Sequence, residues 1–405
     1  MASVTVLSTA CCTAVADLTL GKMLDQKKNK GEPRPYLANV NVRWGSFNLS
    51  DLREMRFEPH EAERYGLRAG DIVMCEGGEP GRCALWQNQV PGTMLQKALH
   101  RIRVRQGVDA RFLFYSLFAK GRAGELEYLF TGATIKHLPS EQLAKVSVTL
   151  PPLGEQRRIA SILGAYDDLI EVNRRRIAVL EEMARRLFEE WFVHFRFPGH
   201  AKRQSMAVGS AEDLIDFDPP TRLPRQGEKP FVPMTQLSTS SSLIDSHEWR
   251  ESGSGAKFMN GDTLFARITP CLENGKTGLV RGLPGDGVGF GSTEFIVMRG
   301  SRAGPAFTYL LARHEAFRFH AQKSMSGATG RQRARTESVR TFSFASPPKE
   351  ILDRFEALAW PILELVGQLG EMNRRLAASR DLLLPRLISS DLPITTAERE
   401  LEAVA

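Results

Sequence analysis

The feature that most constrains this chain is an internal repeat. Gly70-Asp71 returns as Gly261-Asp262, Pro151-Pro152 as Pro347-Pro348, and Glu171-Val172-Asn173-Arg174-Arg175 as Glu371-Met372-Asn373-Arg374-Arg375. Because the landmarks keep their order and a nearly constant offset, they predict two copies of one module, each a globular part followed by a helix. Two copies in one chain form a pseudo-dimer, which suits a target that is itself in two halves.

Length and composition limit the class of protein. The chain has 405 residues, enough for two or three domains, and a net charge of +7 that favours a polyanionic partner. Its five cysteines, at 11, 12, 75, 83 and 271, have no metal-ligand spacing, and their odd number argues against a disulfide framework. We therefore expect a reducing, cytoplasmic location. Residues 1–16 read as a strand rather than a signal peptide, and the absence of a long apolar run predicts no membrane partner.

A long helix is predicted after the first globular part. Pro151-Pro152 suits the first turn of a helix, and Glu155 complements the positive end of the helix dipole. From Ile159 to Trp191 apolar residues recur at alternating steps of four and three, which is the seam of a coiled coil. Pro198-Gly199 are expected to end the helix.

The second helix has a matching seam from Leu352 to Leu376. Pro361 lies inside it and predicts a kink or a break between a short first piece and a longer second one. Both seams place an asparagine at an equivalent position, Asn173 and Asn373. A buried asparagine fixes the register of a coiled coil at some cost in stability, whereas one at the edge of the seam is solvated and has no such role. The sequence leaves both interpretations open.

Neither helix can bury its apolar stripe alone, so we expect the two to pack on each other, antiparallel, with the globular parts at opposite ends of a rod. The predicted fold class is α+β: two α/β domains separated by two long antiparallel coiled-coil helices, in an internal tandem repeat. The predicted boundaries are a first domain over 1–150, a spacer helix over 151–198, a second domain over 199–345, a second spacer helix over 346–392 and a tail over 393–405.

Basic residues in the globular parts suggest contacts with DNA. Arg101, Arg103 and Arg105 alternate with apolar residues, which predicts a strand with one basic face. Helices are predicted over 110–120 and 306–319, and polar segments follow at 131–137 and 326–335, where Gly and Thr leave amides free for phosphates and arginines add guanidinium groups. The candidate DNA contacts are Arg101, Arg103, Arg105, Lys136, His137, Arg267, Lys276, Arg331, Gln332, Arg333 and Arg335. The alternative is a solvated face of loops or edge strands.

Several of these motifs resemble a known family. Pro151-Pro152-Leu153-Gly154-Glu155-Gln156-Arg157-Arg158-Ile159 resembles the conserved-region signature of specificity subunits of type I restriction–modification systems, and Ser379–Leu387 is similar to the family's ending of its second conserved helix. The Gly132-Ala133-Thr134 and Gly327-Ala328-Thr329 turns resemble the polar turn that closes each target-recognition domain. The resemblance covers nearly the whole chain. It departs at Ser390, where the family usually has Gly, and at Lys349-Glu350, which replace the expected Leu-x-Glu-Gln.

The resemblance implies a DNA-recognition subunit that reads a bipartite target, one domain for each half, with the helix pair as spacer. It implies no catalytic centre and no cofactor in this chain. Its implied partners are double-stranded DNA, two modification subunits that bind S-adenosylmethionine and methylate adenine, and restriction subunits that translocate and cleave DNA. Phe188, Trp191 and Phe192 place large apolar groups on more than the one stripe that the partner helix can cover, so we expect them to bind the modification subunit.

Three catalytic motifs fail on inspection. Asp218-Pro219-Pro220-Thr221 lacks the aromatic residue of an adenine methyltransferase pocket. The segment ending in Gly275-Lys276-Thr277 has Pro270 where a phosphate loop needs its first Gly. His314-Glu315 is followed by Arg318 where a zinc helix needs its second His. These failures favour a binding subunit over the two alternatives, a stand-alone methyltransferase or nuclease and a coiled-coil scaffold, since the scaffold leaves the duplicated domains unexplained.

Overall fold

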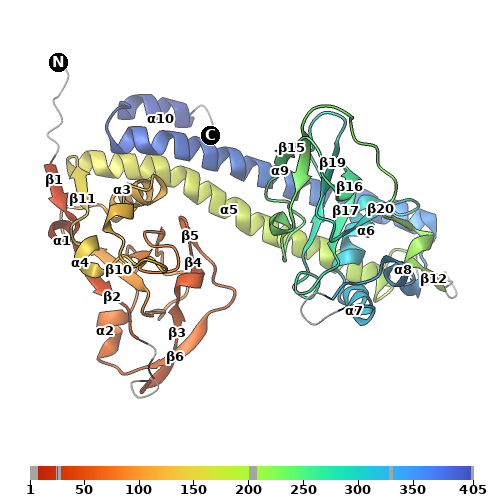
Figure 1. The fold of residues 1–405 in the computed structure, drawn as a ribbon, viewed down its shortest axis with the longest axis horizontal. Helices are drawn as coiled ribbons and strands as arrows, with labels where there is room; N and C mark the ends of the chain where they lie inside the picture. The colour runs from red at the N-terminus through yellow and green to blue at the C-terminus, as the bar shows by residue number, and fades with distance from the viewer. Residues whose placement is uncertain (1–7, 24, 26–28, 200–207, 328–331, 403–405) are drawn as a thin grey trace. The chain divides into compact units, whose positions relative to one another are not determined.

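The computed structural model describes residues 8–23, 25, 29–199, 208–327 and 332–402. The chain divides into two compact units, Met1–Asp168 with Leu376–Ala405, and Leu169–Arg375. Each unit contains one globular part and a portion of each long helix. We call the described residues from 8 to 150 the first domain and those from 208 to 345 the second domain (Figure 1).

The first domain contains eleven of the described strands and several short helices. Its elements are β1 (Ser8–Cys11), α1 (Cys12–Val15), β2 (Ala16–Leu20), β3 (Glu32–Leu37), η1 (Asn39–Asn41), β4 (Val42–Arg43), β5 (Ser46–Phe47), β6 (Arg53–Phe57), α2 (Glu61–Tyr65), β7 (Ile72–Cys75), β8 (Cys83–Leu85), β9 (Met94–Leu95), β10 (Leu99–Val104), α3 (Ala110–Arg122), η2 (Glu127–Leu129), α4 (Ser140–Leu143) and β11 (Ser147–Leu150).

The second domain repeats much of this order. Its elements are β12 (Val208–Ser210), η4 (Ala211–Asp213), β13 (Ile215–Phe217), β14 (Lys229–Val232), η5 (Met234–Gln236), β15 (Glu248–Arg250), β16 (Ala256–Met259), β17 (Thr263–Ala266), β18 (Thr277–Leu279), β19 (Val288–Gly291), β20 (Phe295–Gly300), α6 (Pro305–Arg313), α7 (Glu315–Lys323), α8 (Thr336–Val339) and β21 (Ser343–Ala345).

The sheet topology confirms the duplication. A sheet of order β2-β10-β7-β8 in the first domain corresponds to β13-β20-β17-β18 in the second, and the terminal pair β1-β11 corresponds to β12-β21. A further sheet has order β6-β3-β9 in the first domain and β15-β14-β19-β16 in the second. In it, β3 runs parallel to β9 and β14 runs parallel to β19, within otherwise antiparallel sheets. Both copies therefore share one mixed α/β fold.

The helix that covers the main sheet differs between the copies. In the first domain α3 is one helix, capped by the Asp109 carboxylate, which accepts the Phe112 N–H at 2.9 Å. In the second domain the single helix predicted over 306–319 is wrong, because His314 adopts an extended conformation and separates α6 from α7. The break lets Arg313 and Arg318 on either side of it donate to one loop of the domain.

Two long helices, α5 (Leu153–Phe192) and α9 (Lys349–Ile388), follow the domains. The predicted break at Pro361 is absent, since α9 continues through it. Proline removes one helical hydrogen bond, but Ala359 and Leu363 beside it are fully buried in the core of the second domain, which holds the helix together. α5 ends five residues before the predicted Phe197, because Phe195 takes a left-handed conformation with φ of 56°.

The ends of the second helix also clarify the departures from the family pattern. Ser390, which stands in place of the family's Gly, has a left-handed φ of 65° and lets Leu392 N–H donate to Arg386 O at 3.0 Å. The predicted tail contains a further helix, α10 (Ile394–Glu402). Glu398 of α10 pairs with Arg158 of α5 at 2.7 Å within the first unit.

The seam pairing predicted for the helices is confirmed within the second unit. Phe188 of α5 lies against Phe355 of α9, and Ile177 packs with Val366 and Leu369. Since residue numbers rise along α5 as they fall along α9, the helices are antiparallel there. Among the described helices, none is long and apolar enough to cross a membrane.

Asn173, which is buried, and Asn373, which is half-buried, form a hydrogen-bonded pair between the helices. The Asn173 amide is fully buried and donates to the Asn373 side-chain carbonyl at 3.0 Å, while the Asn373 amide donates to Ile170 O at 3.4 Å. Of the two interpretations of these residues, the structure supports the buried one. A displaced register would leave both amides without these partners, so the pair favours one alignment of the helices.

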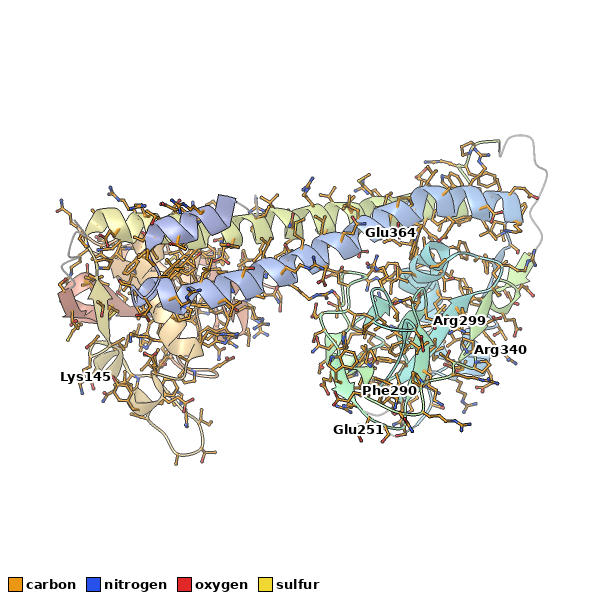
Figure 2. The ribbon with its side chains drawn as sticks, turned by 90° about the horizontal axis from the view of Figure 1, so that it is seen from above. Lys145, Glu251, Phe290, Arg299, Arg340 and Glu364 are labelled. Atoms are coloured by element: carbon orange, nitrogen blue, oxygen red, sulfur yellow. The ribbon has the colours of Figure 1, made fainter. Side chains whose placement is uncertain are left out.

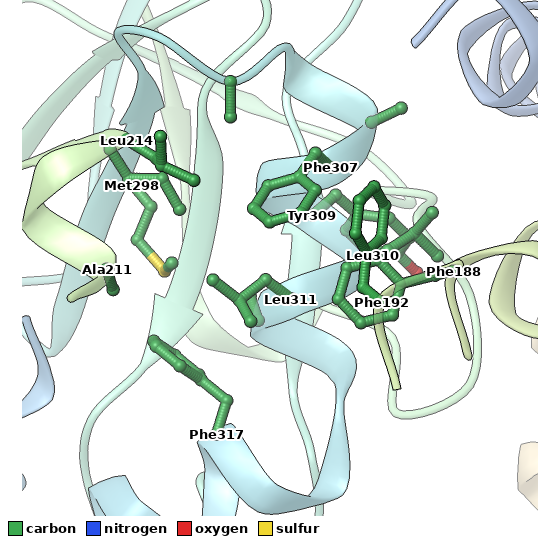
Figure 3. Close-up of a cluster of buried hydrophobic side chains, with 14 of the residues drawn as sticks. Phe188, Phe192, Ala211, Leu214, Met298, Phe307, Tyr309, Leu310, Leu311 and Phe317 are labelled. Atoms are coloured by element: carbon green, nitrogen blue, oxygen red, sulfur yellow. The ribbon is translucent and has the colours of Figure 1, made fainter. Parts of the chain in front are cut away.

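The aromatic cluster of α5 is part of a hydrophobic core, which corrects its predicted role as an exposed docking site. Phe188, Trp191 and Phe192 are buried. The ring centroid of Phe192 lies 4.9 Å from that of Phe307 in α6 and 4.8 Å from that of Phe355 in α9. Figure 3 shows Phe188 and Phe192 beside Phe307 and Leu310. The apolar groups outside the seam are thus covered by the chain's own second domain.

Each domain is also fixed to α5 by a buried tyrosine. The Tyr115 hydroxyl of α3 donates to Asp167 at 2.6 Å in the first unit, and the Tyr309 hydroxyl of α6 donates to Glu181 at 3.1 Å in the second. Burial, together with the neighbouring carboxylate, raises the pKa of both tyrosines, so that the hydroxyls stay protonated donors. Neither contact was visible in the sequence.

Candidate nucleic-acid interface

In the second domain, the loop between β17 and β18 lies against the two paired segments that contain Ser326 and Arg333, which we call the hairpin. Ser326 and Arg333 exchange backbone hydrogen bonds of 3.1 and 3.0 Å. Thr269 N–H donates to Gln332 O at 3.0 Å, and Ala334 N–H donates to Arg267 O at 2.8 Å, which joins the loop to the hairpin. The structure therefore brings together Arg267, Gln332 and Arg333, three of the predicted DNA contacts.

The first domain has an equivalent loop and hairpin. Thr131 and His137 exchange two backbone hydrogen bonds of 2.8 Å, and Leu138 N–H donates to Glu76 O at 2.7 Å. Gly132 has a φ of 96°, and a Cβ there would lie 2.2 Å from the Ile135 carbonyl oxygen, so the tight turn requires glycine. The predicted contacts Lys136 and His137 are exposed on this hairpin.

The two interfaces differ in charge at their junction. Glu76 N–H donates to Ala98 O at 2.8 Å, and Arg267 N–H donates to Glu294 O at 3.0 Å. Because the carbonyls of both residues also accept the backbone N–H of the residue that follows the hairpin, Leu138 or Ala334, Glu76 and Arg267 occupy the same position in the two copies. One copy thus has a carboxylate where the other has a guanidinium.

Arginines from α6 and α7 support the loop of the second domain. Arg313 donates to Gly275 O and Arg318 to Glu273 O, each at 2.7 Å. Lys276, a predicted DNA contact, lies at the far end of the same loop, where its ammonium donates to Met234 O at 2.9 Å. The two supporting arginines could not be identified from the sequence, because their acceptors are backbone carbonyls about 40 residues away.

The remaining arginines of the hairpin have partners within the domain. Arg333 pairs with Glu294 at 2.6 Å, and this carboxylate raises the pKa of the guanidinium. Arg335 donates to the Ser326 hydroxyl at 3.1 Å. Both side chains are exposed, so a phosphate can reach them while these contacts hold their position. Arg331 lies outside the described residues.

Arg101 and Arg103 of β10, and Arg105 directly after it, all have partners within the domain, which differs from the predicted free basic face. Arg101 is buried, donates to Gly66 O at 3.0 Å and Thr19 Oγ1 at 3.1 Å, and has a pKa lowered by burial. Arg103 and Arg105 form ion pairs of 2.7 and 2.6 Å with aspartates of neighbouring strands and turns. The strand alternation was predicted correctly, but carboxylates distant in sequence cover the face.

Arg103 belongs to a motif that recurs in the second domain. It forms two 2.7 Å hydrogen bonds with the buried Asp71, as Arg299 does with the buried Asp262 (Figure 2). Each aspartate follows a glycine of positive φ, Gly70 or Gly261, and also accepts a backbone N–H of its own turn. The sequence showed the repeated Gly-Asp pair but gave no indication of its arginine partners.

Asp218, from the Asp-Pro-Pro-Thr segment, has a structural role. Its two carboxylate oxygens accept the Val297 N–H at 2.9 Å and the Thr336 hydroxyl at 3.0 Å. In the part of the chain that the structure describes, no three His, Cys, Asp or Glu side chains are grouped to hold a metal ion. The five cysteines are free thiols, and burial raises the pKa of Cys12 to about 12.

These features define a class of protein: a chain with two copies of one mixed α/β domain, each presenting a loop and a basic hairpin and each joined to a long helix. Residues 21–182 match the family model of the type I restriction modification DNA specificity domain. The match covers this part of the chain, and the resemblance to type I specificity subunits found in the sequence is confirmed.

Individual relatives agree with the family match. The specificity subunit of the type I restriction enzyme MjaIX from Methanocaldococcus jannaschii is 29% identical over 126 residues, 31% of this chain and 28% of the relative. The EcoAI specificity subunit from Escherichia coli is 29% identical over 149 residues, 35% of this chain and 25% of the relative. The chain thus spans about a quarter of the length of these relatives.

One solved structure extends the comparison to the whole fold. The S subunit of a type I restriction–modification system from M. genitalium aligns over 96% of this chain and 97% of its own length, with a TM-score of 0.58 at 14% sequence identity. The two chains therefore share a fold that includes both copies and both long helices.

Proposed function

We propose that this chain is the DNA-recognition subunit of a type I restriction–modification complex and that it reads a bipartite target. The observation that carries the proposal is the duplicated interface: each domain presents a braced loop and a hairpin with exposed cationic side chains. Backbone amides and cations in such loops position DNA phosphates, while side chains at their tips reach base edges. Two different interfaces in one chain read two different half-sites.

The chain acts in this proposal without a catalytic centre or cofactor of its own. The family description concerns DNA specificity, and the relatives are named as specificity subunits. Methylation then belongs to modification subunits, two for each chain, and translocation and cleavage belong to restriction subunits. No observation favours a stand-alone methyltransferase, a nuclease or a plain scaffold.

The outer faces of the long helices are the proposed docking surface for the modification subunits, in place of the buried aromatic cluster. Leu358, Leu365 and Met372 recur at every seventh residue of α9 and are 52, 42 and 47% exposed. On α5, Val172 and Val179 show the same spacing and are 48 and 59% exposed. A second apolar row beside a filled seam is what a further helix needs for coiled-coil packing.

The experiment is co-expression of this chain with an adenine modification subunit from the same genome, followed by mapping of methylated adenines in host DNA. We expect methylation at one bipartite sequence, and none when either partner is expressed alone. Methylation by this chain alone, or a target with a single continuous half-site, would contradict the proposal. Mass measurement of the complex tests the two-to-one ratio, and Leu365→Glu with Met372→Glu should reduce assembly without unfolding the chain.

A further inference from the structure

A cavity of 530 Å³ lies in the second domain beside the loop–hairpin interface. Its walls come from the turn after β13, the start of β16, and residues at or next to the ends of β17 and β20. Arg267 belongs both to the cavity and to the interface, since its backbone carbonyl accepts a hydrogen bond from Ala334, the residue after the hairpin. The DNA interface of the second domain is therefore continuous with this cavity.

One side of the cavity is cationic. Arg222, Lys257 and Arg267 line it, and the cavity's single lining carboxylate, Asp218, already accepts hydrogen bonds on both oxygens. The Nε–H of Arg267 is buried and has no hydrogen-bond partner among the residues that the structure describes. A buried donor without a partner is costly in a folded protein, so the hydrogen-bonding capacity of the Arg267 side chain is not fully used by the described residues.

The other side of the cavity is apolar. Phe295, Val297 and the Pro219-Pro220 pair contribute to its lining. An anion alone gains nothing from such a surface, whereas a nucleoside brings a flat apolar face next to its phosphate. The volume is also within the range of about 300–1,000 Å³ that is common for small-molecule sites, and larger than a lone phosphate needs.

The internal repeat provides a comparison within the same chain. The position of Arg267 is occupied in the first domain by Glu76, whose backbone carbonyl likewise accepts a hydrogen bond from the residue after the hairpin, Leu138. A carboxylate there repels a phosphate. The cationic side of the cavity is accordingly a property of the second domain and not a requirement of the shared fold.

We propose that this cavity binds a nucleoside phosphate, with the phosphate held by Arg267, Arg222 and Lys257 and the nucleoside against the Pro219-Pro220 pair. The ligand comes either from a DNA strand lying on the interface or from a free nucleotide. The first source rests on the proposed function, since it requires that the second domain binds DNA.

The test compares two charge reversals in the full-length chain, purified with its modification subunits. Arg267→Glu copies the residue of the first domain, and Arg340→Glu makes the same change at an exposed arginine of the second domain that does not line the cavity (Figure 2). Binding of mixed-sequence duplex DNA is measured over a range of salt concentrations. Binding of free deoxyadenosine monophosphate is measured by calorimetry, and thermal unfolding shows that both variants are folded.

If a DNA strand supplies the ligand, Arg267→Glu weakens duplex binding by about 10- to 100-fold, the loss of a charged hydrogen bond. It also lowers the salt slope by about 0.9 for each lost phosphate contact, more than Arg340→Glu does. If the ligand is a free nucleotide, the monophosphate binds the unmodified chain but not Arg267→Glu, while duplex binding is equal in the two variants.

The proposal is overturned if the monophosphate does not bind and the two variants bind duplex equally. A different result concerns the proposed function itself: if the unmodified complex does not bind duplex DNA at all, DNA recognition by this chain is wrong. In that case the monophosphate titration still decides whether the cavity is a nucleotide site.

Discussion

At the residue scale, arginines of the two domains differ in their surroundings. Arg101 is buried, Arg103 is paired with a buried aspartate, and Arg333 is exposed. The difference depends on partners 32 to 39 residues away, such as Asp71 and Glu294, and a single sequence does not show such pairings. The partners of residues that donate to backbone carbonyls, such as Arg313, are harder to predict, because every residue has a backbone carbonyl and the sequence does not mark the one that accepts.

The repeated aspartate–arginine pair gives a prediction about stability. Asp262→Asn should lower the free energy of unfolding of the second domain by roughly 3 kcal/mol, since it leaves the guanidinium of Arg299 without its buried charge partner. The matched control is Asp17→Asn, which breaks the exposed pair with Arg105 and should cost about 0–1 kcal/mol. Urea unfolding followed by circular dichroism measures both. Equal losses in the two variants would show that burial of the aspartate is unimportant.

A second residue-scale prediction concerns pH. Burial raises the pKa of Glu356, although its carboxylate accepts the Ala306 and Phe307 N–H groups at the start of α6. The folded chain therefore holds this proton more tightly than the unfolded chain. Its contribution to stability is complete below the ordinary carboxyl pKa of 4.5 and is lost as the pH rises through the raised value.

Glu356→Gln keeps a carbonyl acceptor for α6 and removes the ionisation, so it should flatten the decline of stability above pH 4.5. Melting temperatures measured from pH 4 to pH 8 provide the comparison. The matched control is Glu350→Gln, in the first turn of the same helix and outside the core. A pH profile that is identical in Glu356→Gln and the unmodified chain would contradict the assignment.

At the element scale, periodic features were predicted well and local interruptions were not. The heptad seams located both long helices because each buried stripe spans many turns, and the seam residues Ile170, Ile177 and Val366 are buried as expected. Pro361 was expected to interrupt its helix but does not, whereas His314, inside a predicted continuous helix, interrupts it. Tertiary contacts decide such positions, and α10 was missed because its packing partner is α5.

The position of the aromatic cluster leads to an element-scale prediction. Phe188→Ala should lower the free energy of unfolding of the second unit by about 3–5 kcal/mol, because the ring fills a core shared by α5, α6 and α9. Val179→Ala on the exposed face of α5 is the control and should change stability by less than about 0.5 kcal/mol. If the Phe188→Ala variant is as stable as the unmodified chain but no longer assembles with the modification subunit, then Phe188 is a docking residue, as first predicted from the sequence.

At the scale of the whole molecule, the tandem repeat predicted a duplicated mixed α/β fold, and the sheet topology confirms it. For the proposed function, the sequence could not assign the bases that each domain would read, because these depend on side chains at the loop tips. Glu76 of the first domain and Arg267 of the second make equivalent backbone hydrogen bonds but carry opposite charges. The same backbone position therefore attracts anions in one domain and repels them in the other.

The helix lengths give a prediction about the DNA target. Inserting one heptad after Arg176 in α5 and one after Leu369 in α9 keeps the seam in register and lengthens the pair by about 10 Å. At about 3.4 Å per base pair, the gap between half-sites should grow by about three base pairs while both half-site sequences stay the same. Methylation mapping gives the new gap. An insertion in α5 alone is the control and should disrupt the pair, and a folded double-insertion variant with the original gap would refute the spacer role.

The asparagine pair has a further consequence, for the ancestry of the chain. Asn173 and Asn373 are corresponding residues of the two copies, and each contacts the other across antiparallel helices. A residue that meets its own counterpart marks a local twofold axis, the arrangement found in a symmetric homodimer. A protein containing a single copy could form the same contact with a second molecule of itself. This local contact between the helices is the one expected if the chain arose by fusion of two identical subunits, whose loops and hairpins were then free to diverge.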